Sequence, residues 1–124
     1  MSEKVEKIIY FCTHGGEDAE RASICFAMAG AAVALDIETT VALQGKAVYL
    51  AQNGYIDHLA ATGGFAPLSK LIGDFLELGG KILVCKPCIE ERNIKETDLI
   101  EGASVTAGGT LNLLALESDA HLVY

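Results

Sequence analysis

The chain has 124 residues, of which 51% are hydrophobic and none is tryptophan. This composition is typical of one packed globular domain, residues 1–124, and excludes a disordered chain. Nine basic residues against 17 acidic ones give a net charge of -8, and the basic residues are scattered, so we expect neither nucleic acid nor an anionic membrane surface as a partner.

The first third of the chain predicts a strand, a helix and a strand. Met1–Lys7 is charged and leads directly into a strand-like segment, so no signal peptide is expected. The apolar run Lys7–His14 predicts a strand buried on both faces, which a pair of glycines ends. Two acidic residues then begin a helix whose apolar positions recur at helical spacing as far as Leu35. Ile37–Leu43 predicts the second strand.

The rest of the chain continues this alternation. Lys46–Asn53 predicts a short helix, and the mixed stretch that follows, as far as Phe65, gives no assignment. Pro67 opens a second long helix with one apolar face up to Leu78, and Gly79–Gly80 ends it. The remaining predicted elements are a strand at Lys81–Lys86, a short helix from Pro87 to Arg92, a strand at Ser104–Ala107, a helix at Thr110–Leu116 and a strand at His121–Tyr124.

Strands that alternate with helices imply parallel crossover connections. We therefore predict an α/β fold, a three-layer α/β/α sandwich with a mostly parallel central sheet of about five strands. The longest apolar run, Ile24–Leu35, is too short and too rich in Gly and Ala to span a bilayer. Four cysteines in a chain without a secretory signal favour a reducing cytoplasm, where a close cysteine pair is more often catalytic or metal-binding than structural.

Reactive side chains follow two of the predicted strands. The first strand ends in CTHGG, residues 12–16, and the third ends in CKPC, residues 85–88. Ligands bind beyond the carboxyl ends of parallel strands, so both stretches are candidate sites. If the two strands were neighbours in the sheet, all these side chains would converge at one edge.

The pair Cys85 and Cys88 has the stronger case as a catalytic site. Cys85 would lie just before a helix and Cys88 in its first turn, where free backbone amides and the helix dipole stabilise a thiolate; Lys86 adds a cation. Glu90 and Glu91 oppose this effect, so we expect the pKa of Cys85 to be lowered only modestly. Cys88 could then resolve a disulfide or persulfide formed on Cys85. The alternative is that both cysteines only fill space in the protein interior.

The first stretch is a weaker candidate, for binding a substrate or an anion. It consists of Thr13, His14 and Gly15 with Cys12 beside them, at a glycine turn that opens a helix. The turn lacks both the GxGxxG spacing and the P-loop Lys-Ser/Thr. His14 is either a base or proton donor near a thiol or a loop histidine without a special role. Cys12 is either a core residue or a neighbour of the site, whereas Cys25, on the apolar stripe of the first helix, is predicted to be core.

Several stretches that together span most of the chain resemble the DsrE/DsrF-like family of small sulfur-relay proteins. The stretches are Thr13-His14-Gly15 with Glu17-Asp18 and Arg21-Ala22, the strand ILVC ending at Cys85 with Arg92-Asn93-Ile94 after it, and Thr97-Asp98-Leu99-Ile100-Glu101-Gly102 leading to Ala107-Gly108. The order and spacing of these pieces carry the resemblance, rather than any one of them.

The resemblance implies a DsrE/F-like fold with flavodoxin-like topology, similar to the sandwich predicted above. It implies a sulfur carrier or sulfurtransferase-like protein in which Cys85 accepts sulfane sulfur as a persulfide and passes it to a partner thiol. Cys88 matches a cysteine that only some relatives have. Members of the family assemble as trimers or hexamers, so we expect a homo-oligomer, together with a donor or acceptor protein that carries a reactive thiol. We expect no cofactor and no metal.

Three other functions compete with the sulfur relay. The CKPC sequence differs at one position from the CGPC motif of thioredoxin-like thiol–disulfide oxidoreductases, but both prolines of the chain precede Cys88, so neither can serve as the downstream cis-proline of that fold. A metal-binding module is the second rival, with a possible tetrahedral zinc set of Cys12, His14, Cys85 and Cys88. A structural or regulatory oligomer that binds a small anion at the glycine turn is the third.

Overall fold

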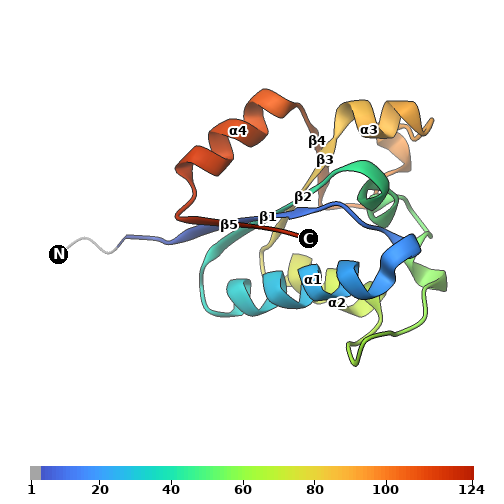
Figure 1. Ribbon diagram of the computed structural model, residues 1–124, viewed down its shortest axis with the longest axis horizontal. Helices are drawn as coiled ribbons and strands as arrows, with labels where there is room; N and C mark the ends of the chain where they lie inside the picture. The colour runs from blue at the N-terminus through green and yellow to red at the C-terminus, as the bar shows by residue number, and fades with distance from the viewer. Residues whose placement is uncertain (1–3) are drawn as a thin grey trace.

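The computed structural model describes residues 4–124, which form one sheet of five parallel strands between layers of helices (Figure 1). The strands are β1 (Lys7–Cys12), β2 (Glu38–Leu43), β3 (Lys81–Cys85), β4 (Ala103–Thr106) and β5 (Ala120–Val123). The α-helices are α1 (Ala19–Ala34), α2 (Leu68–Glu77), α3 (Lys86–Glu91) and α4 (Gly108–Glu117). Short 3₁₀ helices are η1 (Gly16–Asp18), η2 (Gly45–Ala51), η3 (Ile56–His58) and η4 (Glu96–Asp98). The predicted three-layer α/β/α fold is confirmed.

The predicted elements are all present, with small differences at their ends. The strand predicted to reach His14 ends at Cys12, and the next two residues begin the connecting turn. The helix predicted at Lys46–Asn53 is the 3₁₀ helix η2. The stretch that gave no assignment contains η3, a single turn. These differences lie in short irregular connections, where no long apolar period exists to be read.

The strand order is β4-β3-β2-β1-β5, with every neighbouring pair parallel. The chain adds strands one by one from β1 to β4, and α4 then crosses back over the sheet to place β5 beside β1. This order differs from the 2-1-3-4-5 order of flavodoxin-like sheets, so that part of the expected topology is wrong. Because β2 lies between β1 and β3, the two candidate strand ends are not neighbours.

The two faces of the sheet are covered unequally (Figure 1). Helices α1 and α2 pack against each other on one face, and α4 lies on the other. The larger core lies under α1 and α2, where the rings of Phe26 and Phe75 meet edge to face with centroids 5.7 Å apart. Under α4 the buried cluster is only Ile9, Ala42 and Leu111. Most of the stabilising apolar burial therefore comes from one side of the sheet.

Helix α1 begins and packs for reasons that can be read from its sequence. The Asp18 side chain caps its first turn by accepting a hydrogen bond from the Arg21 amide at 3.1 Å. Small buried residues such as Ala22 and Ala29 let its backbone approach the sheet closely. The helix contains most of the long apolar run noted in the sequence. Neither α1 nor any other helix within residues 4–124 is long and apolar enough to cross a membrane.

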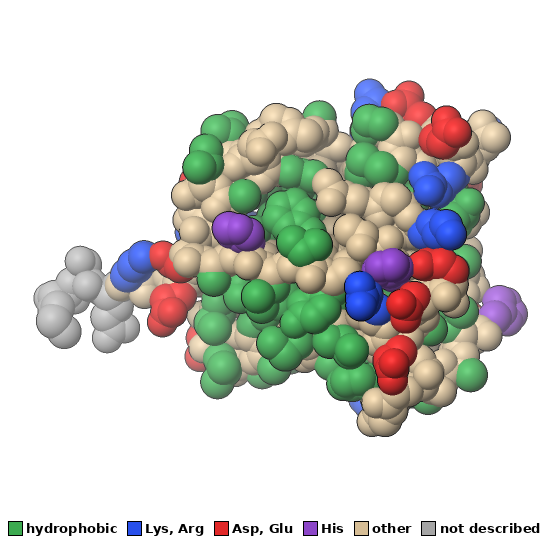
Figure 2. Space-filling view, viewed as in Figure 1, with side chains coloured by type: hydrophobic (Ala, Val, Ile, Leu, Met, Phe, Trp, Pro, Cys, Tyr) green, Lys and Arg blue, Asp and Glu red, His purple; other side chains and the backbone are tan. Residues whose placement is uncertain are grey.

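Helix α4 and strand β5 form a poorly covered surface, called the α4–β5 face below. Leu111 is the only buried residue of α4, whereas Leu113 and Leu116 are 62% and 82% exposed. All four residues of β5 are exposed, including Val123 at 65%. Figure 2 shows hydrophobic side chains along α4 and on both sides of β5. Parallel sheets normally have both faces covered, so this face is unusually bare.

Candidate functional site

The cysteine pair lies where β3 runs directly into α3. Cys85 is both the last residue of β3 and the N-cap of α3, and its extended backbone leads into the helix without a loop. Pro87 is the second residue of the helix, where its fixed φ is tolerated, and Cys88 is the third. Both thiols are free and half-buried. The backbone therefore holds the two thiols on one turn at the carboxyl edge of the sheet.

The neighbouring strand contributes a backbone contact to this pair. Gly45 follows β2, and its amide donates a hydrogen bond to the Cys88 Sγ at 3.3 Å. Its φ of +56° is in the left-handed region, which glycine adopts most readily. The contact exists because β2 pairs with β3, so residues beyond their ends meet. The sequence marks Gly45 as a strand end but does not give the strand order, and the contact was not predicted.

The environment of Cys85 differs from the expectation of a modestly lowered pKa. Burial raises the pKa of the Cys85 thiol, and its hydrogen bond with the Cys88 thiol raises it further. The Cys88 backbone amide and the Arg92 guanidinium act in the opposite direction but do not outweigh these effects. The expectation of a lowered pKa is therefore wrong, because it counted amides and charges and had no measure of burial. Lys86 was expected to be the cation that lowers the pKa of Cys85, whereas the charge of Arg92 has this effect.

The Tyr49 ring of η2 lies against Arg92. The Arg92 Nη1 donates a hydrogen bond to the Cys88 carbonyl oxygen at 3.1 Å, and its Cζ lies 5.8 Å from the centroid of the Tyr49 ring. Tyr49 stacks on Tyr55 with centroids 5.6 Å apart. The Tyr55 hydroxyl in turn accepts a hydrogen bond from the Gly16 amide at 2.8 Å. These residues connect the two strand ends and could not be assigned from sequence, because η2 and η3 carry no motif.

At the end of β1, the polar groups of the candidate anion site have partners within the protein. The amide and the hydroxyl of Thr13 both donate to the Tyr124 carbonyl oxygen, at 2.7 and 2.8 Å. The His14 Nδ1 lies 2.8 Å from a carboxylate oxygen of Glu17, and the Gly15 amide donates to the other oxygen. A carboxylate of the protein itself thus occupies the place where an anion would bind.

Electrostatics supports this arrangement around Glu17. Burial by itself would raise the pKa of Glu17, but hydrogen bonds with His14 and the Gly15 amide, and the charges of His14 and Lys46, hold it below its usual value. The glycine is required by a close approach: a Cβ at Gly15 would lie 2.6 Å from the Lys46 carbonyl oxygen. The glycine turn is therefore explained by packing against η2.

The other two cysteines are completely buried. Cys25 is a core residue on the buried face of α1, as predicted, and Cys12 is equally inaccessible. The Cys12 thiol donates to the His14 carbonyl oxygen at 3.4 Å. The hydrogen bond with Cys12 and burial raise the pKa of the Cys25 thiol. Cys12 is therefore part of the core, separated by a whole strand from the pair at the end of β3.

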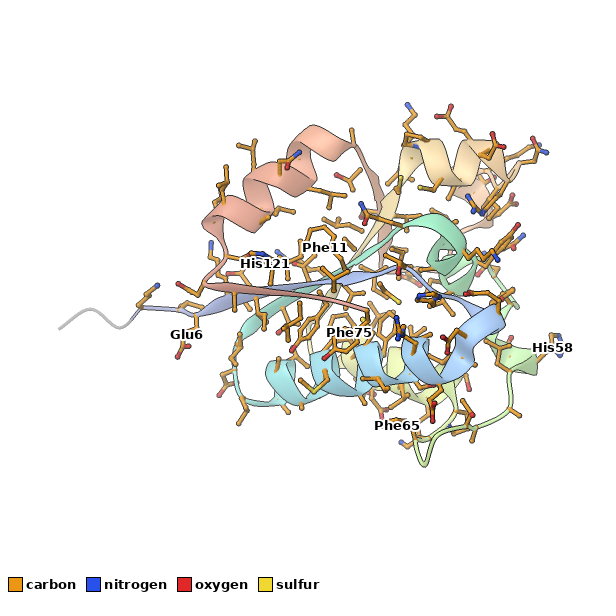
Figure 3. The ribbon with its side chains drawn as sticks, viewed as in Figure 1. Glu6, Phe11, His58, Phe65, Phe75 and His121 are labelled. Carbon is orange, nitrogen blue, oxygen red and sulfur yellow. The ribbon has the colours of Figure 1, made fainter. Side chains whose placement is uncertain are left out.

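The zinc set considered from the sequence does not assemble. Within residues 4–124, no three side chains of His, Cys, Asp or Glu lie close enough together to hold a metal ion. The remaining histidines, His58 in η3 and His121 on β5, are exposed and lie far from each other, as Figure 3 shows. The structure thus brings together Cys85 and Cys88 but not Cys12 or His14.

The sequence of the chain is similar to two uncharacterised archaeal proteins. An uncharacterised protein of Methanocaldococcus jannaschii, MJ0760, is 33% identical over 113 residues, which is 90% of this chain but 41% of that protein, so the chain spans less than half of its length. A second uncharacterised protein of the same organism, MJ0989, is 36% identical over 90 residues, 69% of this chain and 79% of that protein.

Solved structures show the same fold at low sequence identity. The ychN protein from E. coli matches with a TM-score of 0.81 at 18% identity, covering 97% of this chain and 100% of that one. MTH1491 from Methanobacterium thermoautotrophicum, a protein of unknown function, matches with a TM-score of 0.71 at 11% identity, covering 94% and 98%. The model of the DsrE/DsrF-like family matches residues 6–124, nearly the whole chain. The chain therefore belongs to the DsrE/DsrF-like family.

Proposed function

We propose that the protein is a sulfur carrier that accepts sulfane sulfur as a persulfide on Cys85 and passes it to the thiol of a partner protein. The observation that supports this proposal is the half-exposed pair of free thiols at the junction of β3 and α3, in a chain of the DsrE/DsrF-like family. The two buried thiols are inaccessible to a partner, which leaves this pair as the reactive one.

Loading and delivery follow from thiol chemistry. In loading, the Cys85 thiolate attacks the terminal sulfur of a donor such as thiosulfate; the sulfur–sulfur bond of the donor breaks, and sulfite leaves with the electron pair. In delivery, the partner thiolate attacks the terminal sulfur of the persulfide, and Cys85 leaves as a thiolate. Alternatively, the Cys88 thiolate attacks the Cys85 sulfur, hydrosulfide leaves, and a Cys85–Cys88 disulfide forms.

The raised pKa of Cys85 has a consequence for this chemistry. Burial and the Cys88 thiol keep the unloaded Cys85 mostly protonated at neutral pH, and only the thiolate reacts. A persulfide is more acidic than a thiol, so the loaded sulfur is ionised more readily in the same surroundings. We therefore expect loading to become faster as the pH rises through the raised pKa of the thiol, with the loaded form already anionic near neutral pH.

Mass spectrometry of the intact protein tests the proposal. After incubation with thiosulfate, polysulfide or a persulfidated protein, the wild type should gain the mass of one sulfur atom, and Cys85→Ser should gain none. Cys88→Ser is the matched control and should load like the wild type. A wild type that stays unloaded with every donor, while it cycles with a thioredoxin-type reductant in a manner that needs both cysteines, would replace the relay by a thiol–disulfide oxidoreductase.

We also propose that copies of the chain associate through the α4–β5 face. Glu117 and His121 are the only ionisable residues of these two elements, so two chains of net charge -8 can approach there with little repulsion. The outer edge of β5 and the exposed Leu113, Leu116 and Val123 supply unpaired backbone groups and apolar area for a second copy. Light scattering should show an oligomer that Leu116→Glu dissociates. Leu78→Glu is the control and should leave it intact, because Leu78 is an apolar residue, 57% exposed, at the end of α2 and away from this face.

A cytoplasmic location completes the proposal. All four cysteines of the chain are free, although two of them lie three residues apart at an accessible strand end. Free thiols of this kind persist in a reducing compartment, and the relay needs them reduced to accept sulfur.

A further inference from the structure

Arg92 has an unusual environment for a surface cation of this protein. Of the nine basic residues, all but Arg92 and Lys7 are exposed, and Lys7 forms an ion pair with Glu38 at 3.8 Å. Arg92 is half-buried at the end of α3, and no carboxylate within residues 4–124 forms an ion pair with it. A half-buried charge that no carboxylate neutralises needs other partners, and its position shows which ones it has.

Two contacts hold the Arg92 side chain in one orientation. The Nη1 donates to the Cys88 carbonyl oxygen at 3.1 Å, and the guanidinium lies over the Tyr49 ring with its Cζ 5.8 Å from the centroid. Tyr49 is itself fixed by stacking on Tyr55. A ring face attracts a cation without neutralising it. Since the guanidinium has five N–H donors and uses one of them on Cys88, others are free to act on an anion.

The hydrogen bond to the Cys88 carbonyl places this cation beside the turn that carries the cysteine pair, whose sulfurs can become anions. Arg92 lies one helical turn beyond Cys88, and its charge favours the ionised form of Cys85 against the effect of burial. The other ionisable side chains around the pair are Lys46 and Tyr49 from η2, and Lys86, Glu90 and Glu91 from α3 itself. Lys46 and the three residues on α3 are exposed, where water screens their charges, so Arg92 is the cation with the most direct effect on Cys85.

We propose that Arg92 is a positioning residue of the thiol site, held by the Tyr49 ring and the Cys88 carbonyl so that its unneutralised charge stabilises the anionic sulfur of Cys85. It forms no bond to sulfur and transfers no proton. It acts by keeping the thiolate populated before loading and the persulfide anion populated afterwards. The inference rests on the proposed function, because a sulfur carrier is what would use this effect. The effect of the Arg92 charge on Cys85 can nevertheless be measured without any sulfur donor.

The test is the rate of alkylation of Cys85 by iodoacetamide between pH 6 and 11, a range that brackets the ordinary thiol pKa of about 8.5. Cys88→Ser serves as the background, so that Cys85 is the only accessible thiol and intact mass reports its labelling directly. Arg92→Gln should slow alkylation at pH 7 by about threefold or more and move the pH profile upward. Arg21→Gln, which removes the other arginine from an exposed site on α1, is the matched control and should change neither.

Substitutions of Tyr49, whose ring holds Arg92, give a second and independent test. Tyr49→Leu removes the stacking surface and keeps the charge, so it should slow alkylation at pH 7 by less than Arg92→Gln does. Tyr49→Phe keeps a ring face and should behave like the background. Arg92→Lys keeps the charge without the planar group and should restore part of the lost rate.

Two outcomes would overturn the inference. One is an Arg92→Gln profile that coincides with that of Arg21→Gln. The other is a rate that falls by the same factor at every pH from 6 to 11, since an effect of charge must shrink as the thiol becomes ionised, and a constant factor therefore means altered access or folding. A wild type that shows the Arg92 effect but never accepts sulfur would refute the sulfur carrier and leave the positioning role of Arg92 intact.

Discussion

The ends of β1 and β3 carry similar residues but place them in opposite environments. Both end in a cysteine, and a helix follows each of them, after a glycine turn at β1 and without a loop at β3. At β1, Cys12 is completely buried, and the polar groups after it are used by Glu17, Tyr55 and Tyr124. At β3, both thiols are half-exposed, and no carboxylate among residues 4–124 forms an ion pair with the nearby guanidinium.

The difference teaches that a strand end becomes reactive when the neighbouring residues leave its side chains accessible and its nearby charge without an ion-pair partner. The glycine turn after β1 has the composition of an anion site, but a carboxylate three residues from His14 already fills it. Within residues 4–124, the junction of β3 and α3 has no carboxylate contact of this kind; the Gly45 amide donates to Cys88, and Arg92 favours an anionic Cys85 against the effect of burial. Each prediction below perturbs one side of this contrast.

The largest expected effect separates the two pairs of thiols by accessibility. Under native conditions Cys85 and Cys88 should react with iodoacetamide on the order of a thousandfold faster than Cys12 and Cys25, because the buried pair reacts only when the fold opens. Peptide mapping after graded labelling ranks all four. In urea the ranking should collapse, and labelling of Cys25 before Cys85 in the native protein would contradict the described helix packing.

The next effect tests the close approach at the end of β1. Gly15→Ala should destabilise the fold by about 1–3 kcal/mol, since the added Cβ meets the Lys46 backbone at 2.6 Å and backbone cannot move aside cheaply. The midpoint of urea unfolding measures it. Gly30→Ala in α1 is the control: its Cβ meets nothing within 4 Å, so it should stabilise by about 0.5–1 kcal/mol.

The smallest effect concerns the carboxylate that fills the β1 turn. The pKa of Glu17 is lowered in the folded state, so its carboxylate stabilises the fold above the unfolded pKa of about 4.3, and this stability is lost as the pH falls through the folded pKa. Glu17→Gln should therefore cost about 1 kcal/mol near neutral pH, reduced by solvent screening of this partly exposed group, and nothing in strong acid. Glu20→Gln, which removes a carboxylate from the exposed face of α1, is the matched control and should leave the midpoint of urea unfolding near neutral pH unchanged.

The fold and the cysteine pair could be predicted from the sequence because both depend on local patterns. The apolar period of α1 and the apolar run of β3 are read directly, and Cys85 and Cys88 lie on the same turn by their spacing alone. Strand order is set by long-range packing, so the sequence could not show that β2 separates the two strand ends.

The parts of the site that were missed depend on that order. Gly45 and Tyr49 belong to η2, whereas their partners Cys88 and Arg92 lie in α3 and at its end, and these contacts form only because η2 follows a strand adjacent to β3. The direction of the Cys85 pKa shift was missed for a related reason: desolvation depends on how many atoms surround the sulfur, which no local pattern reports.

The position of β5 has a consequence for how the chain folds. Its pairing with β1 aligns Ile8 with Ala120, residues that nearly the whole chain separates, whereas the other three pairings join strands that are consecutive in sequence. Closing a long loop costs more entropy and slows folding, so β1 to β4 should form the early sheet and β5 should join it last, after α4 has crossed over. Until then β1, an inner strand of the finished protein, is an open edge, and this interval is when the newly made chain is most exposed to aggregation.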